Sequence, residues 1–364
     1  MKKRDISHAV ALCITLIISG LILGCSDDDK AVTPAEWSWS PLGSGCNSYV
    51  EGSTVYDNKL IIAGQFDAAG GVSASHIAAW NGASWAPLGL GVNSDIGALT
   101  VYNNQLIAGG WLTSAGGNSA NYIAAWDGVS WAPLGSGMNN AVWALTVYDN
   151  KLIAGGQFTT AGGVAANYIA AWNGSSWSPL GTGLGAQVHS LTVLGDKLIA
   201  GGWFATAGGV SANCIAAWNG SSWSALSSGM ANGLGNLGVY ALAVYKDTLY
   251  AGGRFLTAGG NGVNHIARWN GSTWSPLGLG MGAAVLGLTV FDGKLIAGGE
   301  FVAAGTVLAN HVAAWDGSSW SAVGTGTNSI VFDISVFRDK LIAGGMFTTA
   351  GEVDVSYIAE WSLK

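Results

Sequence analysis

The chain has 364 residues, only 10% of them charged, and a formal net charge of −7 at pH 7. A hydrophobic content of 49% argues against a disordered chain, and the acidic balance argues against nucleic acid as a partner. The 57 glycines suit a β-rich protein with many turns.

The N-terminus has the parts of an export signal in their usual order. Basic residues at positions 2–4 precede the apolar run Ala9–Leu23, which at about 15 residues is short for a membrane span. The run leads into Gly24-Cys25 and resembles the bacterial lipobox, in which the cysteine is lipidated and becomes the mature N-terminus. We therefore expect a lipoprotein signal peptide over residues 1–24 and a lipid on Cys25. The alternative is an uncleaved anchor helix.

The segment after Cys25 is short and acidic. Its Ser26-Asp27-Asp28-Asp29 is similar to the export signal of surface-exposed lipoproteins in Bacteroidetes-type bacteria, with a plain acidic spacer as the alternative. We expect residues 25–36 to be a flexible tether, with the protein held by its lipid at the bacterial cell envelope, on the outer membrane or the cell surface. Removal of residues 1–24 leaves 11 basic and 20 acidic residues. No basic patch for nucleic acid remains.

Seven tryptophans follow at intervals of 46, 46, 46, 51, 46 and 46 residues. They are Trp80, Trp126, Trp172, Trp218, Trp269, Trp315 and Trp361. Spacing this regular indicates one supersecondary unit written seven times. Repeated units share one continuous core, so we expect a single repeat domain.

The third full repeat illustrates the expected unit. Val142–Tyr148 is β-branched and aromatic, which predicts a strand, and a two-residue turn leads into a returning strand over Lys151–Phe158. A loop over residues 159–167 follows. Tyr168–Trp172 and Trp177–Gly181 are the third and fourth strands, joined by an Asn-Gly turn.

The chain ends favour a closed ring over an open solenoid. The last repeat stops at Trp361–Lys364 and lacks its fourth strand, whereas Trp39–Gly43 near the other end has the sequence of that strand. Closure by such an exchange hides both free sheet edges. We therefore predict an all-β fold: a seven-bladed β-propeller of four-stranded antiparallel blades over residues 37–364, closed by the N-terminal strand. We interpret the repeated tryptophans as residues that pack the blades.

The repeat resembles the kelch repeat. The shared features are an aliphatic second strand ending in Gly-Gly, as at Gly155-Gly156, an aromatic residue in the third strand and a tryptophan opening the fourth. Blade one departs with Ala63-Gly64. The longer pattern is similar to the kelch-like repeats of fungal cortical cell-polarity marker proteins and of uncharacterised bacterial lipoproteins. The resemblance implies a propeller and leaves the function open.

Two columns of the aligned repeats vary in chemistry while their neighbours stay uniform. The first column, near the start of strand one, contains Glu51, Gly97, Trp143, His189, Tyr240, Leu286 and Phe332. The second column, directly after the glycine pair, contains Gln65, Trp111, Gln157, Trp203, Arg254, Glu300 and Met346. The hairpin turn predicts that Val142 pairs with Gln157, which makes Trp143 and Gln157 diagonal neighbours.

Both columns are therefore expected at the same end of every blade. The kelch resemblance implies that this end is the ligand-facing mouth. We expect a carbohydrate or protein ligand there, because aromatic rings beside polar groups suit such surfaces. The candidate binding residues are Glu51, Trp143, His189, Tyr240, Phe332, Gln65, Trp111, Gln157, Trp203, Arg254 and Glu300. Alternatively, the variable columns are tolerant positions without a ligand.

We assign no cofactor, metal site or catalytic residue from the sequence. His76, His265 and His311 occupy one repeat column and belong on different blades, so a shared metal is not expected. Cys46 and Cys214 lie three repeats apart, which argues against a disulfide.

The leading functional hypothesis is a monomeric, lipid-anchored binding or interaction module. One alternative is a polysaccharide lyase or hydrolase that uses Glu51, His189 or Glu300. Another is a purely structural repeat protein.

Overall fold

A computed structural model describes residues 36–232 and 237–364 of the chain. Within these ranges, Glu36–Lys364 form one compact unit. The predicted signal peptide, Cys25 and nearly all of the predicted tether lie outside the described residues. No helix in the described ranges has the length and hydropathy that a membrane crossing requires.

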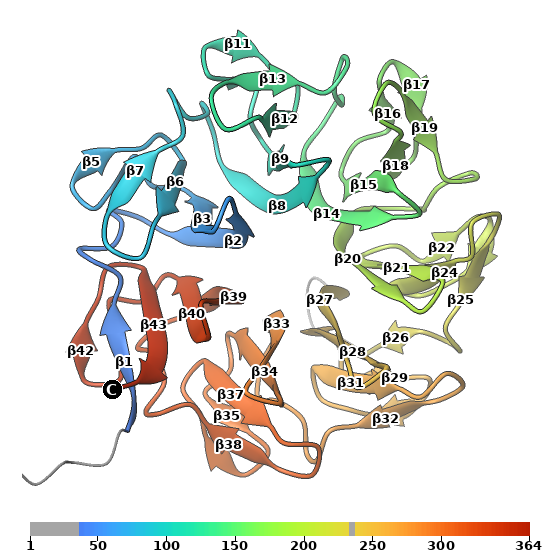
Figure 1. Ribbon diagram of the computed structural model, residues 1–364. Helices are drawn as coiled ribbons and strands as arrows, with labels where there is room; N and C mark the ends of the chain where they lie inside the picture. The colour runs from blue at the N-terminus through green and yellow to red at the C-terminus, as the bar shows by residue number, and fades with distance from the viewer. Residues whose placement is uncertain (1–35, 233–236) are drawn as a thin grey trace, which may run out of the picture. The chain divides into compact units, whose positions relative to one another are not determined.

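Seven four-stranded antiparallel sheets are arranged as blades around a central axis, which confirms the predicted propeller (Figure 1). The innermost strands contact one another in ring order. From blade one to blade seven they are β2 (Val50–Tyr56), β8 (Ile96–Tyr102), β14 (Val142–Tyr148), β20 (Val188–Leu194), β27 (Gly238–Tyr245), β33 (Val285–Phe291) and β39 (Val331–Phe337).

The other three strands of each blade follow outward in the same order. The second strands are β3 (Lys59–Gly64), β9 (Gln105–Gly110), β15 (Lys151–Gly156), β21 (Lys197–Gly202), β28 (Thr248–Arg254), β34 (Lys294–Gly299) and β40 (Lys340–Gly345). The third strands are β6 (Ile77–Trp80), β12 (Ile123–Trp126), β18 (Ile169–Trp172), β24 (Ile215–Trp218), β31 (Ile266–Trp269), β37 (Val312–Trp315) and β43 (Ile358–Leu363). The outer strands are β7 (Trp85–Pro87), β13 (Trp131–Pro133), β19 (Trp177–Pro179), β25 (Trp223–Ala225), β32 (Trp274–Pro276), β38 (Trp320–Ala322) and β1 (Trp37–Pro41).

The segment predicted as a loop between the second and third strands contains a small hairpin in each blade. These hairpins are β4 (Ala68–Ala69) with β5 (Val72–Ser73), β10 (Ser114–Ala115) with β11 (Asn118–Ser119), β16 (Thr160–Ala161) with β17 (Val164–Ala165), β22 (Thr206–Ala207) with β23 (Val210–Ser211), β29 (Thr257–Ala258) with β30 (Asn261–Gly262), β35 (Ala303–Ala304) with β36 (Val307–Leu308), and β41 (Thr349–Ala350) with β42 (Val353–Asp354). In blade five, β26 (Met230–Ala231) adds to β29. Glycines with positive φ, such as Gly162 and Gly163, make these turns.

The N-terminal strand closes the ring as predicted. β1 pairs antiparallel with β43, and Trp39 lies opposite Trp361. Backbone hydrogen bonds between Glu36 and Lys364 extend this pairing to the C-terminal residue.

The outer-strand tryptophans join each blade to the preceding one. The indole N–H of Trp177 in blade three donates to the carbonyl of Leu134 in blade two at 3.0 Å, and the indole is buried. Equivalent bonds of 2.9–3.0 Å are made by Trp39, Trp85, Trp131, Trp223, Trp274 and Trp320. The third-strand tryptophan also packs backward, since Trp172 lies against Gly135. These contacts confirm that the repeated tryptophans pack the blades.

A β-bulge corrects the predicted hairpin register. Val142 pairs with Gly156, and Ala144 pairs with Gly155, so Trp143 is an extra residue and Val142 does not pair with Gln157. The prediction was wrong because the turn length does not reveal a bulge. The same bulge occurs in all seven blades, and its extra residue is always the member of the first variable column.

The glycine pair makes both the bulge and the blade contact possible. A Cβ on Gly156 would lie 2.2 Å from the Ala141 carbonyl oxygen, so the bulged chain needs a glycine there. A Cβ on Gly155 would lie 2.5 Å from Val188 in the next blade, so the first glycine allows the inner strands to approach. Blade one has Ala63 at this first position.

A polar cluster distinguishes the seam between blades seven and one. The Ser53 hydroxyl donates to the Asp333 carboxylate and lies 2.5 Å from the Ser335 hydroxyl. Other blades have Gly, Ala or Ser at the position of Asp333. Burial raises the pKa of Asp333 to about 6, although the bonds from Ser53 oppose this shift.

Replacing one inter-blade indole is expected to destabilise the ring. Trp177→Phe leaves the Leu134 carbonyl without its donor and should lower the free energy of unfolding by about 1–3 kcal/mol. Urea unfolding followed by circular dichroism measures the change. The control is Trp111→Phe, because Trp111 is 47% exposed. Equal losses in both variants would contradict the proposed role of the hydrogen bond.

The seam carboxyl is expected to make stability depend on pH. Because folding raises the pKa of Asp333, this residue contributes most favourably to the free energy of unfolding in acid. That contribution is lost as the pH rises from about 4 to about 6. Asp333→Asn should therefore match the parent protein near pH 4. Near pH 8 it should be more stable by roughly 1–2 kcal/mol, a figure reduced because Asp333 is only half-buried and lines a second cavity between the inner strands. Thermal unfolding measured between pH 4 and pH 8 tests this prediction, with the exposed Asp354→Asn as control. Parallel curves of stability against pH for the parent and Asp333→Asn would refute the prediction.

Candidate ligand-binding mouth

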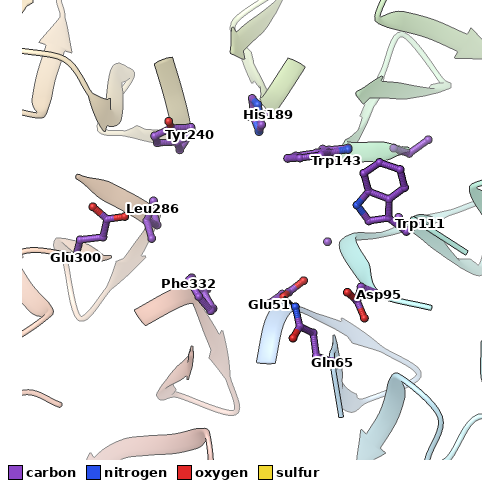
Figure 2. Close-up of a pocket in the computed structure, with 13 residues that line it drawn as sticks. Glu51, Gln65, Asp95, Trp111, Trp143, His189, Tyr240, Leu286, Glu300 and Phe332 are labelled. Carbon is purple, nitrogen blue, oxygen red and sulfur yellow. Dashed lines mark hydrogen bonds between the residues drawn. The ribbon is translucent and has the colours of Figure 1, made fainter. Parts of the chain in front are cut away.

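A cavity of about 470 Å³ opens at the end of the ring where the inner strands begin. Figure 2 shows its side chains arranged around one opening, contributed by different blades. Its lining residues are Glu51, Gln65, Asp95, Gly97, Gly110, Trp111, Val142, Trp143, His189, Tyr240, Leu286, Glu300 and Phe332.

All seven members of the first variable column line this cavity. Each is the extra residue of a β-bulge, and a bulge re-aims the side chain of its extra residue. Seven bulges in register around the ring therefore bring seven residues to one axis, and six of them, all except Gly97, direct a side chain toward it. From the second column, Gln65, Trp111 and Glu300 reach the cavity.

Three predicted binding residues do not line the cavity. Trp203 packs against the His189 ring, with centroids 4.7 Å apart, and Arg254 pairs with Glu300. Gln157 lies beside Ala141, to which its backbone N–H donates. Gln65, Trp111 and Glu300 have the same register and do reach the cavity, so the bulge alone does not explain the position of Gln157.

Aromatic rings form a continuous arc through blades two to five. Trp111 and Trp143 are 6.3 Å apart between centroids at 63°, and Trp143 meets His189 edge to face at 4.7 Å. The His189 ring in turn contacts Trp203 and Tyr240. Trp203 is held in place by Gly238, where a Cβ would lie 2.3 Å from the indole. Such contacts lock the ring orientations and give the mouth a rigid apolar wall.

Two carboxyl groups, from blades one and two, lie next to the Trp111 end of the aromatic arc. Gln65 Nε2 donates to Glu51 Oε1 at 2.9 Å. Burial, followed by the charge of Asp95, raises the pKa of Glu51 to about 7, although the bond from Gln65 opposes the shift. Figure 2 shows Glu51, Gln65 and Asp95 on one side of the opening. A carboxyl of this kind exchanges its proton near neutral pH.

The remaining ionisable groups at the mouth are neutralised in different ways. Arg254 Nη2 donates to Glu300 Oε1 at 2.7 Å and also contacts the second oxygen, so this carboxylate has its own counter-charge. Burial lowers the pKa of His189 to about 4, which leaves the ring uncharged at neutral pH.

Asp95 is a lining residue that the sequence comparison missed. It lies two positions before Gly97, and the corresponding residues of the other blades are Tyr49, Ala141, Gln187, Gly238, Ala284 and Ile330. This column varies as much as the two that were selected. Extending the same comparison by two positions would have found it.

The repeated histidines serve their own blades. His76, His265 and His311 each place Nδ1 3.0–3.3 Å from a glycine carbonyl of the second strand. Among the described residues, no group of three or more His, Cys, Asp or Glu side chains could hold a metal ion. Cys46 and Cys214 are free, buried thiols whose pKa values burial raises to about 12 and about 11.

Comparison with known proteins identifies the fold. No protein-family model and no curated protein sequence matches the chain. The extracellular domain of the putative one component system BT4673 from B. thetaiotaomicron is 13% identical, with a TM-score of 0.60 over 89% of this chain. That match covers only 39% of the BT4673 chain.

Other similar structures include two WD40 propellers. The WD40 domain of Doa1 is 15% identical, with a TM-score of 0.59 over 90% of this chain and 96% of that one. The WD40 repeats of RRP9 are 12% identical, with a TM-score of 0.54 over 91% and 99%. Likenesses at these identities show a β-propeller fold alone.

Proposed function

We propose that the protein is a monomeric, extracytoplasmic binding module whose ligand, a carbohydrate, occupies the mouth of the propeller. One observation carries the proposal: the seven bulges place six chemically different side chains and one glycine at a single cavity, while the packing positions of the repeats stay uniform. A purely structural ring has no need for this variety.

The chemistry of the mouth favours a sugar. Indole faces such as those of Trp111 and Trp143 suit the apolar faces of sugar rings, and Gln65, Glu51 and Glu300 offer hydrogen-bonding groups. A cavity of about 470 Å³ is within the range of small-molecule sites.

Unpaired polar atoms around the arc support the same ligand class. Trp143 Nε1 and His189 Nε2 are buried without a hydrogen-bond partner among the described residues. Each such group costs about 1–3 kcal/mol. Hydroxyl groups both donate and accept, so a sugar hydroxyl within reach of these atoms could offset this cost.

A second candidate function is hydrolysis of a polysaccharide. The observation in its favour is Glu51, whose pKa of about 7 beside the Asp95 carboxyl suits a general acid or base. Glu300 is paired with Arg254, and His189 is held neutral, so Glu51 is the strongest acid–base candidate of the three named from the sequence.

We also propose the kelch-like classification and a lipid anchor on Cys25, after removal of residues 1–24. The Gly-Gly pair that ends the second strand and the tryptophan that opens the fourth strand support the kelch-like classification. The basic, apolar and Gly-Cys segments occur in the order of a lipoprotein signal and support the lipid anchor. Under this proposal, residues 25–36 are the tether, and the protein is located at the bacterial cell envelope.

Loss of the lipid should release the protein from the membrane. We expect Cys25→Ala to lose metabolic labelling with a fatty-acid probe and to leave the membrane fraction. Cys13→Ala is the matched control, because Cys13 lies within the predicted signal peptide. Unlabelled parent protein, or continued membrane fractionation of Cys25→Ala, would count against the anchor.

Removal of the two indoles that line the cavity should abolish binding. On a glycan array, we expect Trp111→Ala with Trp143→Ala to weaken the parent interaction about tenfold or more. Leu279→Ala is the control, because Leu279 is 65% exposed and does not line the cavity. Unchanged binding would reject the mouth as the site.

Two further outcomes of this experiment identify the alternatives. Indole-dependent capture of a protein, without glycan binding, would indicate a protein ligand. Release of reducing ends that Glu51→Gln abolishes would indicate a hydrolase.

A further inference from the structure

Blade two leaves a notch in the wall of the mouth. Its bulged residue is Gly97, the one member of the first variable column without a side chain. A Cβ placed on Gly97 would meet no atom within 4 Å. The two flanking blades place Glu51 and Trp143 at the corresponding positions, and all three residues line the cavity.

Blade two itself supplies Asp95 and Trp111 beside the notch. The backbone N–H of Trp111 donates to the Asp95 carbonyl at 2.9 Å, which fixes the two residues next to each other. The Trp111 and Trp143 rings meet at 63° and form a corner. The notch is therefore bordered by two indole rings and two carboxyl groups.

The negative charge in this part of the mouth lacks a basic counter-charge. The described residues that line the cavity include three carboxyl groups and no lysine or arginine. Arg254 compensates Glu300. His76 Nδ1 lies 3.5 Å from Asp95 Oδ1, but it is closer to the Gly64 carbonyl, at 3.0 Å. Gln65, the hydrogen-bond partner of Glu51, is uncharged.

The residues around the notch suit one kind of cation better than another. A calcium ion takes six to eight oxygen ligands, and two carboxyl groups flanked by indoles do not supply them. An organic ammonium group is attracted by the faces of aromatic rings as well as by carboxylates. The notch combines aromatic ring faces with partly buried carboxyl groups, and this combination suits an organic ammonium group.

We propose that the notch at Gly97, bordered by Glu51, Asp95, Trp111 and Trp143, binds an organic ammonium group of the ligand. The inference rests on the proposed function, since it assigns a charged subsite within the same mouth. It specifies that the ligand is a quaternary amine or an amino sugar rather than a neutral saccharide.

Calorimetry with isosteric probes tests the charge requirement on the full chain. Choline and 3,3-dimethylbutan-1-ol have nearly the same shape, and only choline carries a charge. We expect the affinity for choline to exceed that for 3,3-dimethylbutan-1-ol by about tenfold or more. The affinity for the glucosamine tetramer should exceed that for the N-acetylglucosamine tetramer by a similar factor, because only the former carries ammonium groups. Preference for the glucosamine tetramer without choline binding would identify an amino sugar. Binding of both cations would identify the ammonium group itself.

Variants of the notch provide the structural test. Gly97→Leu should abolish choline binding by filling open space, as Leu286 does at the corresponding position of blade six. Glu51→Gln and Asp95→Asn should each weaken binding about fivefold or more. Asp127→Asn is the control, because asparagine occupies that turn position in four other blades. Unchanged affinity in Gly97→Leu, confirmed as folded by circular dichroism, would overturn the proposal.

The pH profile gives an independent readout. Choline does not titrate at its nitrogen, so its binding reports the protein. Protonated Glu51 attracts no cation, and affinity should rise between pH 6 and 8 in the parent but stay flat in Glu51→Gln. Among the described residues, the other ionisable groups that face Glu51 or the mouth are Asp95, His76, His189, Tyr240, Arg254, Glu300 and, in the second cavity between the inner strands, Asp333. A rise that persists in Glu51→Gln would contradict the assignment.

The two proposals fail differently. Binding of neutral glycans that depends on Trp143, without preference for an ammonium group, would refute only the charged subsite. Absence of any binding that depends on Trp111 or Trp143 would refute the ligand-binding mouth as well.

Discussion

The hydrogen bond from each outer-strand indole to the preceding blade is the interaction on which the ring depends. A single blade cannot bury its pair of tryptophans, because their partners are the leucine and the glycine that follow the outer strand of the preceding blade. Every blade therefore needs a predecessor. Only a closed ring provides one for blade one, where Trp85 bonds to Leu42 just after β1. Blade seven takes its tryptophan, Trp39, from β1 itself.

The packing of the blades and the formation of the mouth depend on the same short motif. The first glycine of the pair lets the next inner strand approach, and the second accommodates the bulge that turns one side chain toward the axis. The bulged position is thus released from packing and can carry any chemistry. In blades three to five this position carries the aromatic residues Trp143, His189 and Tyr240, whereas in blade one it carries Glu51, whose carboxyl lies near that of Asp95.

The regular features of the fold could be predicted because they are local. Alternating strands, tight turns and the offset between Trp39 and Trp361 together indicated a closed ring. The pairing of Val142 with Gln157 was wrong, since the bulge arises from contacts of the backbone with Gly156 that turn length does not report. Of the candidate site residues, those in the bulged column reached the cavity, whereas Gln157, Trp203 and Arg254 did not. Asp95 was missed because its column was not compared.

By itself, the sequence determined the number of blades, their strand order and which positions vary, because these follow from the period of the repeat. Only the tertiary structure decided what the varying positions do together. Glu51 and Asp95 belong to different repeats, and the raised pKa of Glu51 depends on burial and on the Asp95 charge that ring formation brings close. The open space at Gly97 likewise exists only relative to its neighbours in adjacent blades. Chemistry shared between repeats is a property of distances across the ring, and a repeat pattern contains no such distances.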